Sequence, residues 1–218
     1  MYALDFSKYA SAVEIPRIRS LWNSLPSQLA KENRKFIYRI VKSGARAREY
    51  EDALLWLEEA GLIYRIFNVS KPGMPLSAYQ DLSAFKVYAC DCGLLRRLAK
   101  LSPEVILSGN TGYTEFKGAL TENAILQALI PQSDVSPYYW SSENRAEVDF
   151  VLQLPLQVVP VEVKSDARIS GKSLSVYNNK FEPAVRVRLS MNNLKENGGL
   201  LSCPIPLADW LYKIMALV

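Results

Sequence analysis

Three charged side chains stand out in the second half of the chain because each interrupts an apolar pattern. Asp149 lies in one apolar run, and Glu162 and Lys164 lie in the next. Side chains alternate along a strand, so Glu162 and Lys164 share one face while the valines on either side of Glu162 face the other way. An acid on one strand can therefore converge with an acid and a lysine on the following strand.

A third acid, Glu122, lies on the predicted helix over residues 115–129. It shares a helix face with the apolar residues three before it and four and seven after it, Ala119, Leu126 and Leu129. We expect its carboxylate to point toward the sheet, where a charge is costly unless it is paired.

Such a set suits phosphodiester hydrolysis. Carboxylates hold Mg²⁺ through one or two ligands plus waters, the ion polarises a phosphoryl oxygen and generates hydroxide, and an ammonium group orients the nucleophile. The chain has no histidine, which excludes Ser-His-Asp triads, Cys-His dyads and histidine zinc sites. Its three cysteines cannot complete a four-thiolate zinc site.

Structural alternatives remain open for each of these residues. Glu162 and Lys164 can form an ion pair at a strand end, and Glu122 can be a buried acid paired with a structural base. Asp149 can accept hydrogen bonds from backbone amides. A rival phosphate-binding motif, Gly171-Lys172-Ser173, is disfavoured because Asp166 stands where a P-loop needs glycine.

The first part of the chain reads as helices followed by a hairpin. We predict a helix from Ile15-Pro16 that ends at Leu25-Pro26, an ambiguous segment over 35–41, and an amphipathic helix over 47–60 that Gly61 stops. Strands over 62–69 and 84–90 follow, joined by a loop rich in proline and glycine. Helices followed by a two-stranded wing are typical of a winged helix.

From residue 103 the pattern changes to that of an α/β domain with a mixed sheet. A helix over 115–129 precedes strands over 138–141, 147–154 and 157–164, then a helix over 173–181 and a strand over 184–190. We place the domain boundary between residues 102 and 103, and we expect Tyr138, Tyr139 and Trp140 in the sheet core.

Positive charge is concentrated in two stretches of a chain whose net charge is +4. Residues 31–48 carry seven bases against one acid, and a second basic stretch spans 164–195. Local excess of this kind suits a polyanion such as DNA, although solvated surfaces also carry charge runs. The helix over 47–60 is flanked by acids that repel phosphates, so we expect nucleic acid to contact residues 31–48 instead.

The composition is that of an ordinary globular protein of 218 residues, 49% of them hydrophobic. The amino end has no basic stretch followed by an apolar one, and no apolar run approaches the ~20 residues of a membrane span. We therefore expect a cytoplasmic protein without membrane contact. We predict that the three cysteines are buried and reduced, and that Cys90-Asp91-Cys92 lies on a strand.

Asp149, then Glu162-Val163-Lys164 on the next strand, with Glu122 on the preceding helix, resembles the PD-(D/E)xK nuclease superfamily and its restriction-endonuclease-like fold. The residue before Asp149 is valine, so the proline of the superfamily name is absent. More closely, six segments resemble the conserved-domain family of unknown function that forms the carboxyl half of many prokaryotic AAA+-type ATPases: residues 56–62, 91–95, 118–123, 139–140, 146–150 and 160–164.

The resemblance implies a winged helix over 1–102 and a restriction-endonuclease-like, mixed-sheet domain over 103–218. In that family these usually follow a P-loop ATPase half, so this chain resembles a detached or truncated carboxyl half. By position, Asp149 and Glu162 would bind Mg²⁺, Lys164 would be the catalytic lysine, Glu122 an additional acid near the ion, and the Val163 carbonyl would face the ion.

Two hypotheses follow from this resemblance. The first is a DNA-binding, nuclease-like module that hydrolyses phosphodiesters with Mg²⁺. The second is a catalytically silent module that holds DNA or a partner ATPase.

Overall fold

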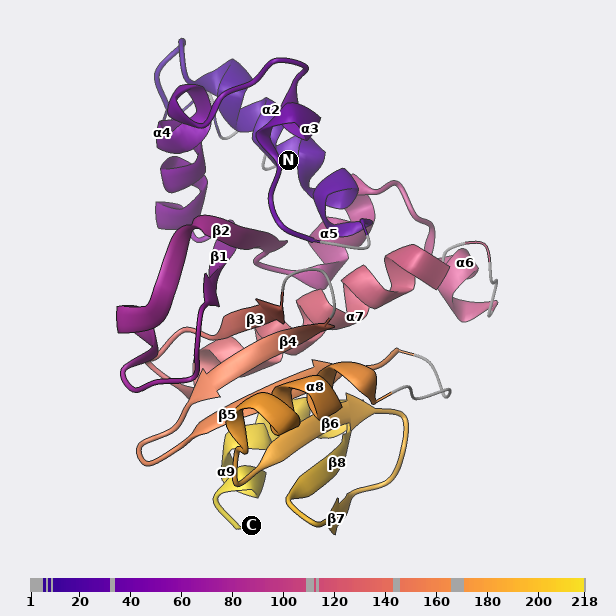
Figure 1. The fold of residues 1–218 in the computed structure, drawn as a ribbon. Coiled ribbons are helices and arrows are strands. Elements are labelled where there is room, and N and C mark those ends of the chain that lie inside the picture. Colours follow the sequence, from indigo (N-terminus) through magenta and orange to yellow (C-terminus); the bar gives the residue numbers. More distant parts are fainter. Residues whose placement is uncertain are drawn as a thin grey trace. The chain divides into compact units, whose positions relative to one another are not determined.

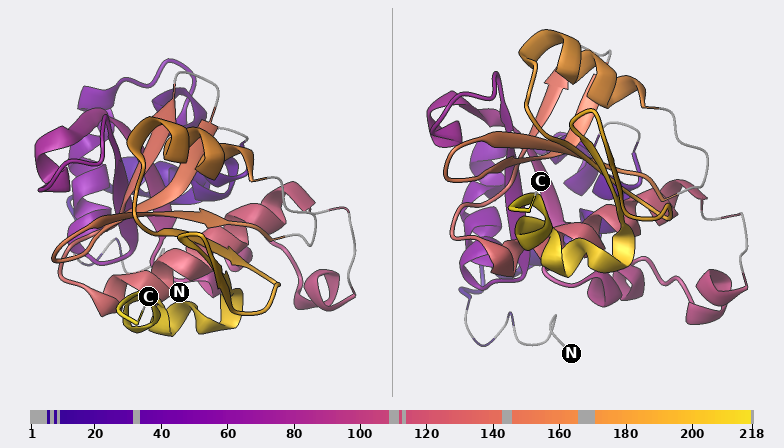
Figure 2. Two further views of the ribbon diagram at one scale, coloured as in Figure 1. Left: turned by 60° about the horizontal axis from the view of Figure 1, so that its bottom comes forward. Right: turned by 90° about the horizontal axis from the view of Figure 1, so that it is seen from below.

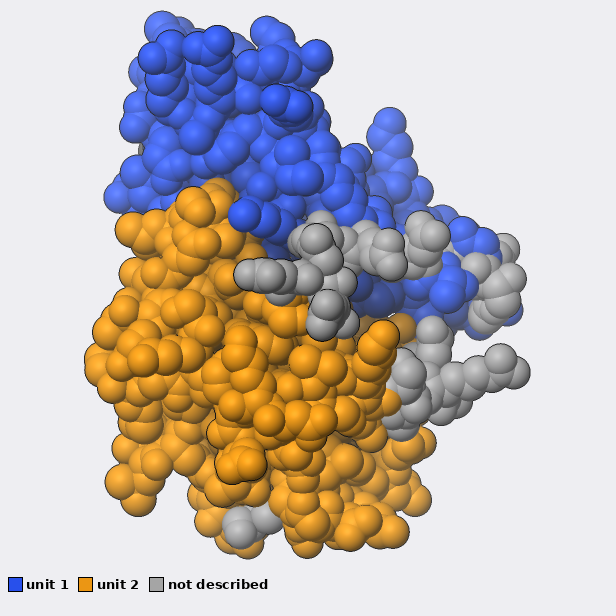
Figure 3. Space-filling model, in the orientation of Figure 1, with its two compact units in different colours: residues 1–65, 86–120 blue, residues 66–85, 121–218 orange. Residues whose placement is uncertain are grey.

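The computed structural model describes residues 6, 8, 10–31, 34–108, 112, 114–142, 146–165 and 171–217. The chain forms two compact units (Figure 3). Unit 1 comprises residues 1–65 and 86–120, and unit 2 comprises residues 66–85 and 121–218. This division differs from a single boundary between residues 102 and 103, because residues 66–85 pack with the later part of the chain.

Unit 1 is mainly helical, and a long hairpin leaves it and returns. Its elements are α2 (Ile15–Leu29), α3 (Tyr38–Val41), α4 (Ala47–Glu59), α5 (Cys92–Leu98) and α6 (Pro103–Leu107) (Figure 1). The hairpin consists of β1 (Ile63–Val69), the 3-10 turn η1 (Leu76–Tyr79) and β2 (Gln80–Ala89), and its strands cross into unit 2. The predicted order of helices followed by a hairpin is confirmed.

Helix α2 is longer than predicted. It begins at Ile15, as expected from Pro16 in its first turn, but it continues through Pro26 to Leu29. The helix buries Leu25 and Leu29 on the same face as Ile18, Leu21 and Trp22. Proline lacks only one backbone donor, so burial of one further turn of apolar side chains offsets the missing hydrogen bond.

Helix α4 ends as the sequence predicts. Its residues Tyr50, Ala53, Leu54 and Leu57 are buried. Gly61 has a φ of +66° and donates its N–H to the Glu58 carbonyl, while the Leu62 N–H reaches the Leu57 carbonyl. This pair of hydrogen bonds is the Schellman motif, which needs a left-handed residue and therefore favours glycine.

The prediction that Cys90, Asp91 and Cys92 lie on a strand is wrong. Strand β2 ends at Ala89, and Asp91 is the N-cap of α5, where its side chain accepts a hydrogen bond of 2.8 Å from the Leu94 N–H. Aspartate is among the best N-cap residues because it satisfies a free amide of the first turn. The three cysteines are free, and only Cys203 is fully buried.

Unit 2 contains the α/β elements in the predicted order, followed by a further strand pair and terminal helices. The elements are α7 (Thr114–Leu129, from residue 121 onward), η3 (Ile130–Gln132), β3 (Tyr138–Ser142), β4 (Ala146–Gln153), β5 (Val158–Val163), α8 (Lys172–Phe181), β6 (Arg186–Ser190), β7 (Lys195–Asn197), β8 (Leu200–Pro204), η4 (Ile205–Trp210) and α9 (Leu211–Met215).

The sheet is mixed, as predicted, with the strand order β2-β1-β3-β4-β5-β6-β8-β7. Strand β4 is antiparallel to both β3 and β5, whereas β3 runs parallel to β1, and β6 runs parallel to both β5 and β8. Within unit 2, α8 covers one face of the sheet, and the end of α7 lies with η4 and α9 on the other (Figure 2). Asp149 on β4 and Glu162 on β5 are buried in this covered part of the sheet.

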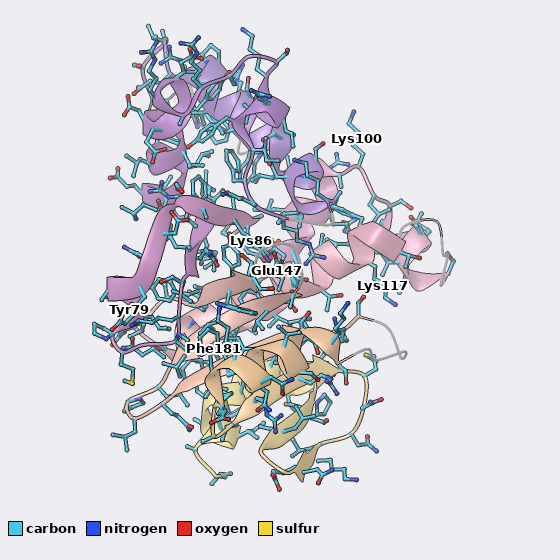
Figure 4. The ribbon with its side chains drawn as sticks, viewed as in Figure 1. Tyr79, Lys86, Lys100, Lys117, Glu147 and Phe181 are labelled. Atoms are coloured by element: carbon cyan, nitrogen blue, oxygen red, sulfur yellow. The ribbon has the colours of Figure 1, made fainter. Side chains whose placement is uncertain are left out.

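The tip of the hairpin and α8 share an apolar core with the central strands. Val69 and Leu76 cluster there with Trp140, Val148, Val151, Leu174 and Tyr177. Phe181, labelled in Figure 4 at the end of α8, packs edge-on against the Trp140 ring with a centroid distance of 5.6 Å. The expected burial of Tyr139 and Trp140 is confirmed, and Tyr138 is half-buried.

In the part of the chain that the structure describes, no helix has the length and apolar character needed to cross a lipid bilayer.

Candidate active site

Asp149 contacts the strand that carries Glu162 and Lys164. Its Oδ2 accepts a hydrogen bond of 2.7 Å from the backbone N–H of Val163, the residue between those two. Asp149 is 9% exposed, so its carboxylate lies within the sheet layer. For Asp149, the alternative of an acid bound to a backbone amide is therefore observed, and the same contact places the acid beside the Glu-Val-Lys segment.

Strand register places Asp149 and Glu162 on one face. The antiparallel pairing of β4 with β5 extends to Phe150 opposite Val161, and because side chains alternate along each strand, the next residues, Asp149 and Glu162, share the opposite face. Side chains of directly opposed residues point to the same side of a sheet. The convergence expected from the spacing is thus supported by both the register and the hydrogen bond.

Glu162 is a buried carboxylate held by two cations. Only 1% of its side chain is exposed. Its Oε2 accepts from Arg188 Nε at 3.2 Å, and its Oε1 lies 3.1 Å from Lys164 Nζ. Oε1 is within ion-pair distance of that ammonium group but makes no hydrogen bond. This oxygen is therefore a buried acceptor with a lone pair that is not used by a hydrogen-bond donor.

Lys164 connects the site to the surface. Its backbone N–H donates to the Leu189 carbonyl at 2.8 Å. This hydrogen bond extends the pairing of β5 with β6 and so fixes the position of the Lys164 backbone. The side chain is 29% exposed, whereas that of Glu162 is almost fully enclosed. Its ammonium group can therefore meet a solvent-borne substrate while it stays beside the carboxylate.

Glu122 is buried on α7, 4% exposed, together with Ala119, Leu126 and Leu129. The predicted inward face of this helix is thus confirmed. Across the described ranges, however, no three His, Cys, Asp or Glu side chains are grouped so as to hold a metal ion. Glu122 does not complete a three-acid cluster with Asp149 and Glu162, and its role as an additional acid near an ion stays a prediction.

The donors at this site fit Mg²⁺ chemically. Magnesium takes oxygen ligands, commonly one or two carboxylates with water in its remaining positions. Asp149 and Glu162 supply two such carboxylates on one sheet face, and Glu162 Oε1 makes no hydrogen bond, although Lys164 Nζ lies 3.1 Å from it. The Val163 N–H is occupied by Asp149. That the Val163 carbonyl faces the ion stays a prediction.

Sequence reasoning missed Arg188. The sequence places it only within the basic stretch over 164–195, whereas in the structure it lies on β6 directly beside Glu162 in the parallel register. Its side chain is 15% exposed. The available signal was its position between Val187 and Leu189, which alternate with it along a buried strand.

The two basic stretches have different surroundings. Within residues 31–48, the structure leaves Lys35, Arg39, Lys42, Arg46 and Arg48 exposed. In the second stretch, Lys164 and Arg188 contact Glu162, and Arg186 donates to the Gly198 carbonyl. Much of the second stretch thus serves contacts within unit 2 rather than a polyanion surface.

The rival motif at Gly171 lies at the start of α8, with Gly171 as N-cap and Lys172 as the first helical residue. Asp166, on which the argument against a P-loop depends, lies outside the described residues.

Fold and site together define a mixed α/β protein whose central strands carry paired carboxylates and paired cations. Residues 1–105 match a domain of unknown function, DUF8612, and residues 117–208 match another, DUF4143. The chain is therefore similar to one domain of unknown function over each of these two ranges. No curated protein matches the chain, and no solved structure does.

Proposed function

We propose that this protein is a DNA-binding, nuclease-like module that hydrolyses phosphodiesters with Mg²⁺, and that it acts in the cytoplasm with an AAA+-type ATPase. The observation that carries the proposal is the 2.7 Å hydrogen bond from Val163 N–H to Asp149 Oδ2, which sets the acid of β4 against the Glu-Val-Lys segment of β5. The resemblance to winged-helix and PD-(D/E)xK domains supports the same assignment.

Asp149 and Glu162 would hold the ion, and each also has a fixed protein partner that limits how its carboxylate can turn. A bound Mg²⁺ would polarise the phosphoryl oxygen and lower the pKa of a water ligand. Lys164, beside Glu162 and partly open to solvent, would orient that water and stabilise charge that develops on the phosphate.

The exposed bases of residues 31–48 would contact the DNA backbone. Lys42 also lines a surface cavity of about 410 Å³ together with Arg17, Ser20 and Ser43, and Glu49 of α4 is part of the same lining. Phosphate contacts of this kind give affinity without reading sequence.

One observation favours the silent alternative, in which the module holds DNA or an ATPase without cutting. Glu162 is neutralised by Lys164 and Arg188, so the fold satisfies its charge without a metal ion.

A cleavage assay decides between the two. Plasmid and linear DNA are incubated with Mg²⁺ or Mn²⁺ and either the wild-type protein or Asp149→Ala. Cutting by the wild type and none by the variant is expected. Equal cutting by both would mean contamination, and no cutting with any divalent ion would leave the silent module. Calorimetric titration of Mg²⁺ into wild type and Glu162→Ala tests the metal site separately.

A further inference from the structure

Arg188 holds one oxygen of the carboxylate that the proposed metal site needs. Its Nε donates to Glu162 Oε2 at 3.2 Å, and the parallel register of β5 with β6 sets the two residues side by side. Both backbones are fixed in the sheet, so the contact does not depend on a loop. The register therefore sets the Arg188 backbone beside Glu162, and the guanidinium group reaches the carboxylate from there.

The other side of the guanidinium group lies against the backbone at the start of α8. A Cβ placed on Gly171 would overlap Arg188 Nη2. Arg188 is thus enclosed between Glu162 and Gly171, and its side chain is 15% exposed. It has little room to turn away when a second cation approaches Glu162.

The formal charges of the site sum to zero. Asp149 and Glu162 contribute two negative charges, and Lys164 and Arg188 contribute two positive charges. A divalent cation that approaches the carboxylates meets both the competing hydrogen bond at Oε2 and the repulsion of a partly buried positive charge. Such repulsion is weakly screened because the site is enclosed.

We propose that Arg188 is a positioning residue that sets the divalent-cation affinity of this site: it occupies Glu162 Oε2, so that the ion must bind at Oε1 beside the Lys164 ammonium group, and it keeps the affinity low. This inference rests on the proposed function, because it assumes that Asp149 and Glu162 bind the ion. It adds that the charge and the placement of Arg188 decide how much free cation is needed to load the site.

The test is calorimetric titration of Mn²⁺ into the full chain, in the wild type, Arg188→Met, Arg188→Lys and Asp149→Asn. Arg188→Met removes the charge and keeps the bulk, and we expect it to bind Mn²⁺ roughly tenfold more tightly than the wild type. Arg188→Lys keeps the charge and should stay within about threefold of the wild type. Asp149→Asn should bind more weakly than either. A purely structural role for Arg188 would not separate the methionine and lysine variants in this way.

Gly171→Ala gives a second variant, in which neither the carboxylates nor Arg188 is mutated. The added methyl group displaces the guanidinium group, so its Mn²⁺ affinity should move toward that of Arg188→Met, while circular dichroism keeps the wild-type spectrum. This variant tests the inference even where Arg188→Met fails to fold.

The outcomes separate the two proposals. Equal Mn²⁺ affinity in the wild type, Arg188→Met and Gly171→Ala, all lost in Asp149→Asn, overturns the role of Arg188 and keeps the metal site. Absence of Mn²⁺ binding in every folded variant overturns the metal site itself.

Discussion

At the scale of single residues, Asp149 is a backbone acceptor as well as a proposed ligand. Its carboxylate satisfies the Val163 N–H inside a covered sheet, so it has a structural role that does not depend on metal. Unfolding experiments without metal can therefore test the hydrogen bond between Val163 N–H and Asp149, on which the proposed function rests.

Asp149→Ala should lower the free energy of unfolding by about 2–3 kcal/mol, because it leaves the buried Val163 N–H without an acceptor. Asp149→Asn keeps an acceptor oxygen and should cost only about 1 kcal/mol. Urea unfolding in the presence of EDTA measures both. Equal losses of unfolding free energy in the alanine and asparagine variants would show that the hydrogen bond to Val163 N–H does not account for the destabilisation.

The thiols should react slowly. Burial raises the pKa of Cys203 to about 11, and burial together with the negative charge of Asp91 raises the pKa values of Cys90 and Cys92. A raised pKa means less thiolate at a given pH. At pH 8 iodoacetamide should therefore alkylate Cys203 at least about a hundredfold more slowly than an exposed thiol, with faster reaction as the pH approaches 11.

Mass spectrometry of the intact protein, before and after denaturation in urea, checks this order. Rapid modification of Cys203 in the native state at pH 8 would contradict its burial.

The residues of the site were predictable to different degrees. Asp149, Glu162 and Lys164 interrupt apolar runs, and alternation along a strand is enough to place them on a face. Arg188 could not be placed, because its contact with Glu162 depends on how β6 pairs with β5, and residues 162 and 188 are paired by register rather than by local pattern.

At the scale of elements, a buried glutamine of α2 binds the backbone of the basic stretch over residues 31–48. Gln28 is 1% exposed, donates to the Ile37 carbonyl at 2.9 Å and accepts from the Ile37 N–H at 3.1 Å. The Gln28 side chain thus makes both backbone hydrogen bonds of Ile37, as a neighbouring β-strand would.

Gln28→Leu should lower the free energy of unfolding by about 2–3 kcal/mol, because it removes both hydrogen bonds to Ile37. Gln28→Glu keeps an acceptor for the Ile37 N–H but sets a buried carboxylate against the Ile37 carbonyl, so it should lose at least as much. Guanidinium unfolding of the two variants gives the comparison, and a loss below 0.5 kcal/mol for the leucine variant, roughly the smallest value for one hydrogen bond, would show that water replaces the amide.

Lys42→Gln should weaken DNA binding equally on unrelated sequences and reduce the slope of log K against log salt by about 0.9, the value for one lost phosphate contact. Lys195→Gln is the matched control, since Lys195 is an exposed lysine of the second basic stretch on β7. Fluorescence anisotropy over a salt series measures both. The same slope in both variants would remove residues 31–48 from the DNA interface.

Most element types could be predicted because hydrophobic periodicity and the stop at Gly61 are local signals. The errors have specific causes. Helix α2 passes Pro26 because tertiary burial outweighs one lost hydrogen bond, and residues 90–92 leave the strand because Asp91 caps a helix instead.

At the scale of the whole molecule, the two units share one chain that passes between them three times. Asn68 of β1 pairs in parallel with Tyr139, and the Leu76 N–H donates to Gln153 Oε1 at 2.7 Å. Local patterns assigned the hairpin to the first half, because pairing across some seventy residues leaves no local signal.

A fragment of residues 103–218 should therefore not fold as a stable unit, because it lacks Val69 and Leu76 from the core around Trp140. Their loss exposes apolar surface and leaves a cavity, and each large-to-small change in such a core costs about 2–4 kcal/mol. Near-ultraviolet circular dichroism and urea unfolding of the fragment check this. A cooperative transition like that of the full chain would show that the hairpin tip is dispensable.

The assignment of residues 66–85 to unit 2 also sets an order of events on the ribosome. This segment is synthesised well before Tyr139 and Gln153, its partners in the sheet. Until they emerge, the nascent hairpin presents an unpaired strand edge together with Val69 and Leu76. Chaperones that bind exposed apolar segments should thus meet this chain during translation, and a pause between residues 85 and 139 would prolong that exposure.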